Sequence, residues 1–312
     1  MEEKTQKILA FPLEKRRIRP ISGNVRPHNQ GVDRAGTMRK GRKTICALLC
    51  FAALAIPVAA LAASSVKSTT YYNIYYDQWQ GVADAMGTYL DAAFTTARDV
   101  LGYDNGSNGK IEIHFYSDPG SSTLGYTIPG SNSFYLNLTH GSSTSDSYLR
   151  DYGATAAHET SHVLFFHETR VNMSSGDAAA YTWLTEAISY YVGDVVYSYG
   201  DKLSKSALGS YLSSYSSNGS KKVSWWTSGD NYKNGSYSAL DLVQLESIGL
   251  YLDSLKGWSG IQSVLTYLSQ GNSVDSAFQK VYGKETGQKD TSTGSTVNTL
   301  YSGYIYYYLG HY

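Results

Sequence analysis

Cysteine is almost absent from this sequence, whose 312 residues include only Cys46 and Cys50. Both lie in one apolar run near the start of the chain, residues 44–63. The chain after this run contains no cysteine, so no disulfide can hold that part together. Its length of about 250 residues is enough to bury a hydrophobic core without covalent cross-links.

Net charge is also lacking in the whole sequence, but the charges are unevenly distributed. The chain has 26 basic and 26 acidic residues, and residues 1–43 contain 12 of the basic ones and only four of the acidic ones. The remainder keeps 14 basic and 22 acidic residues, a formal charge of −8. An acidic protein repels phosphate groups, which argues against nucleic acid as a partner.

The basic segment and the apolar run have the order of a secretory signal peptide. Residues 1–43 are basic, residues 44–63 are apolar, and the run ends in small residues, ALAA at 60–63. We therefore predict a leader over residues 1–63, beginning at either Met1 or Met38, and a secreted, extracellular remainder. The alternative is an uncleaved leader that anchors the protein at the cell surface, because about 20 apolar residues could span a membrane.

The hydrophobic pattern after the leader predicts strands first and helices afterwards. Residues 64–77 are expected to be a linker, flexible over 64–70, at the start of the exported chain. A helix is expected over 78–101, followed by strands at 110–117, 126–128 and 133–138. Further helices are expected over residues 148–168, 178–197, 202–213, 237–256, 260–270, 273–282 and 301–308. This order predicts an α+β domain over 78–312, with an α/β lobe to residue 145 and a helical lobe from residue 146.

One segment of the helix predicted over 148–168 indicates a chemistry. His158 and His162 are four residues apart, so on a helix they lie on the same face, one turn from each other. Two imidazoles in this arrangement can bind one zinc ion, and Glu159 beside them can reach a water molecule on that ion. The sequence His-Glu-x-x-His therefore predicts a zinc hydrolase site. The alternative is a buried helix whose histidines bond to backbone groups.

A catalytic zinc ion needs a third protein ligand and one open position. The best candidate is Glu186, an acidic residue in the helix predicted over 178–197, where Leu184, Ala187 and Ile188 flank it. A carboxylate buried there without a cation or a metal would cost several kcal/mol. The alternative is that Glu186 lies on an exposed polar stripe with Thr185 and Ser189.

These two segments together resemble those of the gluzincins, zinc metallopeptidases whose third ligand is a glutamate on a second helix. The run WLTEA at 183–187 is similar to the W-L-x-E-[GA] sequence of the peptidase MA-like families. The resemblance implies a zincin-like domain whose active-site helix lies between a small β-sheet lobe and a helical lobe. It implies Zn²⁺ as the cofactor, with His158, His162 and Glu186 as ligands and Glu159 as the general base.

The same resemblance implies that the strand at 133–138 is a sheet edge that pairs with extended substrate. Two features differ from the thermolysin-like members of the group. Tyr190 stands where those enzymes have an aspartate that orients a zinc histidine. They also use a downstream histidine in the transition state, whereas the only histidine after His167 is His311, next to the C-terminus.

Zinc aminopeptidases, which are also gluzincins, use a tyrosine for that last task, within a Y-x-x-G segment that opens a helix. The segment YKNG at 232–235 is similar and follows Glu186. This resemblance implies that Tyr232 donates a hydrogen bond to the oxyanion formed on the attacked carbonyl group. Tyr237 is the second candidate, and an ordinary packing role for Tyr232 is the alternative.

The sequence therefore predicts a secreted zinc metalloendopeptidase that acts on a protein or peptide substrate. Zinc activates a water molecule, and Glu159 takes its proton as the water attacks the peptide carbonyl group. Two other functions are compatible with the same residues. One is a zinc-containing cell-surface or wall-binding protein without catalysis, and the other is a zinc hydrolase that acts on a cell-wall amide.

Overall fold

A computed structural model of the protein describes residues 65–119, 121, 123–138, 143–171, 178–198, 206, 209–210, 239–286 and 299–309. The chain divides into two units, Met1–Lys43 and Thr44–Tyr312, and all of these residues belong to the second. The predicted leader and Tyr232 lie outside the described residues, as does most of the helix predicted over 202–213. None of the helices within the described ranges combines the length and the hydropathy that a membrane crossing requires.

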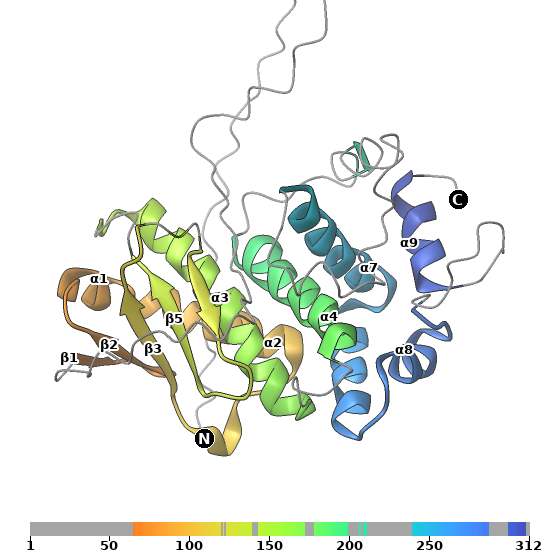
Figure 1. The fold of residues 1–312 in the computed structure, drawn as a ribbon, viewed down its shortest axis with the longest axis horizontal. Coiled ribbons are helices and arrows are strands. Elements are labelled where there is room, and N and C mark those ends of the chain that lie inside the picture. The colour runs from red at the N-terminus through yellow and green to blue at the C-terminus, as the bar shows by residue number, and fades with distance from the viewer. Residues whose placement is uncertain are drawn as a thin grey trace, which may run out of the picture. The chain divides into compact units, whose positions relative to one another are not determined.

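Five strands among these residues form one sheet with the order β1-β2-β3-β5-β4 (Figure 1). β1 (Ser65–Ser68) is antiparallel to β2 (Tyr72–Tyr76), which pairs in parallel with β3 (Ile111–Tyr116). β5 (Ser133–Asn137) is parallel to β3, and β4 (Gly125–Thr127) completes the sheet as an antiparallel edge strand. The strands predicted at 110–117, 126–128 and 133–138 are thus confirmed.

Two predictions about this sheet are wrong. The expected linker over 64–77 contains β1 and β2, because Tyr72 and Ile74 are fully buried and hold β2 in the core, where β1 pairs with it. The predicted sheet edge at 133–138 is not an edge either, because β5 is hydrogen-bonded to β3 on one side and to β4 on the other. The edge strand next to β5 is therefore β4.

α2 and α3 cover one face of the sheet (Figure 1). α1 (Gln80–Ala85) and α2 (Gly87–Leu101) fill the long helix predicted before the strands, with one break at Met86. α2 ends at Gly102, whose φ of 74° is a left-handed conformation that glycine adopts without strain. α3 (Asp146–Thr169) is the predicted motif helix, and most of its second half is buried.

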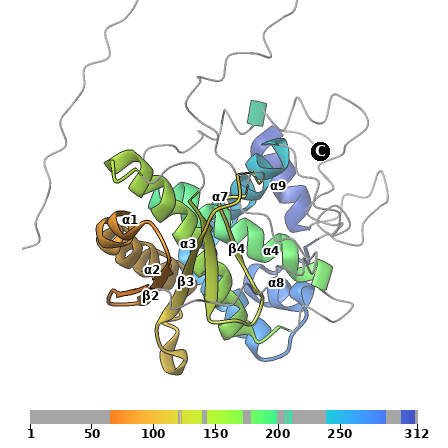
Figure 2. The same cartoon turned by 60° about the vertical axis from the view of Figure 1, so that its left-hand side comes forward.

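The remaining elements are helical and lie on the side of α3 away from α1, as both views show (Figure 2). α4 (Ala178–Tyr190) continues directly into η2 (Tyr191–Tyr197), a stretch of π-helix, and both pack on α3. α7 (Ala239–Ser269), α8 (Val274–Tyr282) and α9 (Leu300–Leu309) follow. A small sheet with its helices and a separate group of helices confirm the predicted α+β class.

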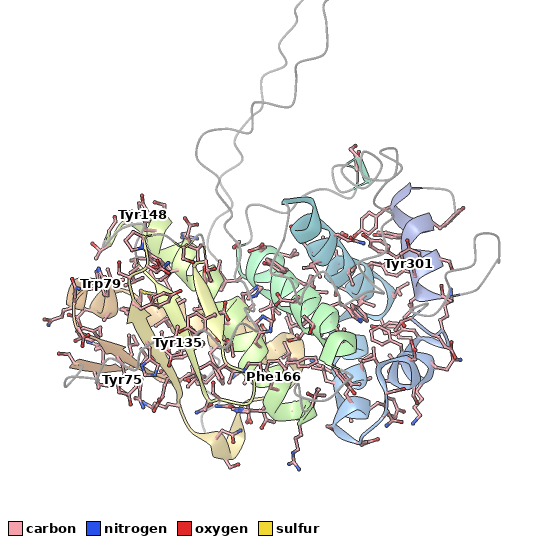
Figure 3. The ribbon with its side chains drawn as sticks, viewed as in Figure 1. Tyr75, Trp79, Tyr135, Tyr148, Phe166 and Tyr301 are labelled. Carbon is pink, nitrogen blue, oxygen red and sulfur yellow. The ribbon has the colours of Figure 1, made fainter. Side chains whose placement is uncertain are left out.

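The face of the sheet turned away from α2 and α3 carries a row of stacked aromatic rings. Tyr75, His114, Tyr135 and Tyr126 are cross-strand partners, and successive ring centroids are 4.9, 5.0 and 4.6 Å apart (Figure 3 labels Tyr75 and Tyr135). These spacings match the distance of about 4.8 Å between neighbouring strands, so each ring covers the face of the next. Some of the 29 tyrosines of this sequence thus stabilise the sheet by stacking across its strands.

Candidate metal centre

The motif residues lie in the buried part of α3. His158, Glu159 and His162 have 4 %, 1 % and 1 % of their surface exposed, and small residues surround them on the helix. The Nε2 atoms of His158 and His162 are 3.1 Å apart, as expected for two histidines one helical turn from each other. Neither imidazole bonds to a backbone group within the described ranges, which contradicts the alternative of histidines bonded only to the backbone.

Glu186 reaches this pair from α4. Its Oε2 atom lies 3.6 Å from Nε2 of His158 and 3.7 Å from Nε2 of His162. The expectation of an exposed stripe is wrong, because Thr185, Glu186 and Ser189 are all buried. The structure thus brings the three predicted ligands together, with one donor atom of each within 4.8 Å of the others.

The spacing and the chemistry of these donors fit a zinc ion. Two atoms bound at about 2.0–2.1 Å to one tetrahedral zinc ion would lie roughly 3.3 Å apart, and the observed separations are 3.1, 3.6 and 3.7 Å. Two imidazoles and one carboxylate are a donor set that catalytic zinc sites use. Among the described residues, the buried Oε1 atom of Glu186 accepts no hydrogen bond. A bound metal ion would give the carboxylate the partner that it lacks.

Burial favours the uncharged forms of the three side chains when no cation is present. It lowers the pKa of His158 to about 3, and burial together with neighbouring His158 lowers the pKa of His162 well below its usual value. Burial and the nearby Glu159 raise the pKa of Glu186 well above its usual value. Both histidines therefore have lone pairs available for a metal ion, and a bound cation would offset the cost of ionising the buried carboxyl group.

Glu159 lies beside the cluster but bonds in another direction. Its Oε2 atom accepts a hydrogen bond of 2.8 Å from Oγ1 of Thr127 on β4, while its Oε1 atom is buried and accepts none among the described residues. Burial raises the pKa of Glu159 to about 8, and the hydrogen bond from Thr127 opposes part of this rise. A carboxylate next to a metal site, with one free oxygen, is suited to accept a proton.

The ligand rings are held in place by contacts from α3 and α4. Nδ1 of His162 lies 2.9 Å from Oγ1 of Thr185; when Nδ1 carries the proton it donates to Thr185, and Nε2 keeps its lone pair for a metal. The ring of Phe166, labelled in Figure 3, lies parallel to that of His162 with centroids 6.4 Å apart. Tyr190, at the position where thermolysin-like enzymes have an aspartate, packs edge-on against His158 at 4.5 Å.

A close contact between η2 and α3 sets the distance between the two ligand helices. A Cβ atom on Gly193 would lie 2.8 Å from the carbonyl oxygen of Ala154 and 3.2 Å from Cβ of His158. Only glycine allows the backbone of η2 to approach α3 this closely. Because η2 continues α4, this contact also positions Glu186 against the two histidines.

Sequence reasoning missed two threonines of this site. Thr185 directly precedes Glu186, and that position in the ligand segment was an available signal. Thr127 had no such signal, because its role depends on how β4 packs on α3. Tyr232 and Tyr237, the candidates for oxyanion stabilisation, lie outside the described residues.

No protein-family model matches this chain, and neither a curated protein nor a solved structure matches it. The side chains of the site and the sequence resemblance of two helices are therefore what indicates a function.

Proposed function

We propose that this protein is a secreted zinc metalloendopeptidase with a zincin-like domain of the gluzincin type. One observation carries the proposal. His158 and His162 from α3 and Glu186 from α4 converge in a buried site with donor atoms 3.1, 3.6 and 3.7 Å apart, and the carboxylate of Glu159 lies next to them with one free oxygen.

His158, His162 and Glu186 would hold the zinc ion. When bound, zinc would polarise the scissile carbonyl group and make a water molecule more acidic. Glu159 would take a proton from the attacking water molecule through Oε1 and deliver it to the leaving amine. Burial, which raises the pKa of Glu159, favours this uptake of a proton. Tyr232 remains our candidate for the group that stabilises the oxyanion.

The position of β4 supports a peptide as the substrate. β4 is a sheet edge, and within the described ranges it pairs only with β5, so the backbone groups on its other side are available to an extended chain. Thr127 in this strand donates a hydrogen bond to Glu159, so the edge lies next to the residue that we propose as the general base. We propose that substrate pairs with β4, in place of the strand at 133–138 that the resemblance implied.

Metal analysis and proteolysis of the purified protein without its leader test the proposal. We expect one zinc ion per chain, cleavage of casein and loss of cleavage with a chelator. Glu159→Ala should keep the zinc and the fold and lose proteolysis, since Glu159 is not a ligand. Cleavage at the wild-type rate by Glu159→Ala would contradict the mechanism.

A parallel assay with purified peptidoglycan separates the other two functions. Release of wall fragments without cleavage of casein would indicate an amide hydrolase that uses the same residues. Binding to the wall that persists with chelator, without hydrolysis of either substrate, would indicate a non-catalytic surface protein.

A further inference from the structure

We propose that the edge strand β4 positions the general base, with Thr127 holding one carboxylate oxygen of Glu159 and Gly125 leaving room for its side chain. This inference rests on the proposed function and adds two residues to the site. Neither residue belongs to the group of metal ligands, so their contribution can be separated from metal binding.

The hydroxyl group of Thr127 on β4 reaches Glu159 on α3. Its Oγ1 atom lies 2.8 Å from Oε2 of Glu159 and 3.2 Å from the backbone oxygen of the same residue. A hydroxyl group has a single proton, and the shorter contact, to the carboxylate, is the stronger one. Thr127 is only 3 % exposed, and its pairing opposite Phe134 in β5 fixes its position within the sheet.

This hydrogen bond distinguishes the two oxygens of the carboxylate. Oε2 is engaged by Thr127, whereas Oε1 is buried and has no hydrogen-bond partner among the described residues. Oε1 is therefore the oxygen that can receive a proton. Without the hydrogen bond from Thr127, the carboxylate could turn and shift, and an oxygen would lie in the position for proton transfer for only part of the time.

Gly125, two residues earlier on the same face of β4, limits the side chain from another direction. A Cβ atom at this position would lie 3.1 Å from Cγ of Glu159 and 3.0 Å from Cγ2 of Thr155. A larger residue would therefore crowd the Glu159 side chain, together with Thr155 and the backbone oxygen of Tyr135, which would lie 3.0 Å away. Tyr126, between the two, belongs to the aromatic row on the opposite face of the sheet and does not contact the site.

Thr127→Val and Thr127→Ser, with Tyr75→Phe in the aromatic row on β2 as the control, test this role. Valine keeps the shape and removes the hydroxyl group, serine keeps the hydroxyl group, and the control removes a hydroxyl group from the other face. We expect Thr127→Val to lower kcat about 10- to 100-fold with KM unchanged within about twofold. Thr127→Ser and Tyr75→Phe should keep wild-type kcat. All three should bind one zinc ion with wild-type affinity, measured by competition with a chromophoric chelator.

Two results would overturn the inference: wild-type kcat in Thr127→Val, or equal losses in Thr127→Val and Thr127→Ser. If Thr127→Val does not fold, Thr127→Ala takes its place with the same expectations. If zinc-loaded wild-type protein cleaves neither casein nor other peptides, the proposed function fails. Crystal structures of the zinc-loaded wild type and Thr127→Val then decide the positioning role, which a displaced Glu159 carboxylate supports and an unmoved one overturns.

Discussion

Replacing Glu186 with glutamine affects the metal-free protein and the zinc-loaded protein in different ways. The side chain is 2 % exposed, and burial with nearby Glu159 holds its pKa well above the usual value, so this site favours the neutral carboxyl group when no cation is bound. Glutamine is neutral and has nearly the same shape, so metal-free Glu186→Gln should unfold with an unchanged or slightly higher free energy. The zinc-loaded variant, in contrast, loses its one anionic ligand.

The expected loss of zinc-induced stability is large. Removing one partner of a buried charge pair costs about 3–5 kcal/mol, which corresponds to a zinc Kd roughly 10²- to 10⁴-fold weaker. With free zinc at about 1,000 times the wild-type Kd, zinc stabilises the wild type by about 4 kcal/mol; a Kd 1,000-fold weaker reduces this to less than about 0.5 kcal/mol. Zinc should therefore raise the wild-type Tm by roughly 8–16 °C and the variant's Tm by less than about 2 °C.

Differential scanning calorimetry with zinc and with chelator measures both effects. Glu246→Gln is the matched control, because Glu246 is a buried carboxyl residue on α7 that does not belong to the metal cluster. This control should keep the full zinc-induced shift in Tm. A wild-type zinc shift in Glu186→Gln would refute its role as a ligand. A large loss of stability in the metal-free variant would refute the argument that this carboxyl group is neutral there.

Three further predictions concern the groups around the ligands. Thr185→Val should weaken zinc binding about 10- to 100-fold, because Nδ1 of His162 loses its partner; unchanged affinity in chelator competition would contradict this orienting role. In the metal-free protein, the free energy of unfolding should fall as the pH rises from about 6.5 to 8. The unfolded chain has released the Glu159 proton in this range, whereas the folded protein retains it up to a pKa of about 8, so the loss from Glu159 is on the order of 2 kcal/mol. Urea denaturation with chelator measures this slope, and a rising curve would contradict it. Gly193→Ala should lower the free energy of unfolding by about 1–3 kcal/mol, because the added Cβ atom would be too close to α3. Gly87→Ala is the control, since the nearest atom to its Cβ would be 3.9 Å away, and it should cause no loss in the same urea denaturation.

Local patterns were sufficient to predict the elements that carry the metal ligands. The motif helix was predicted over 148–168 and runs from Asp146 to Thr169. The helix with Glu186 was also predicted. Its segment is mostly apolar with one carboxylate, and this pattern indicates a buried helix with a polar function without knowledge of the fold. Convergence of the two helices could be expected because the chemistry of three donors requires it.

The elements that the sequence did not reveal depend on contacts between distant segments. β1 has the sequence SVKS and an exposed pattern, so only its pairing with β2 shows it to be a strand. β4 has only three residues, and so short a hydrophobic pattern cannot show that this strand lies at the edge of the sheet. Thr127 contacts Glu159 across 32 positions in the chain, and no local spacing predicts such a contact.

An anomalous-difference map at the zinc absorption edge, from crystals of the zinc-loaded protein, tests the central claim most directly. We predict one strong peak about 2.0–2.2 Å from Nε2 of His158, Nε2 of His162 and a carboxylate oxygen of Glu186. A peak at another position, or none at this cluster in fully loaded protein, would contradict it.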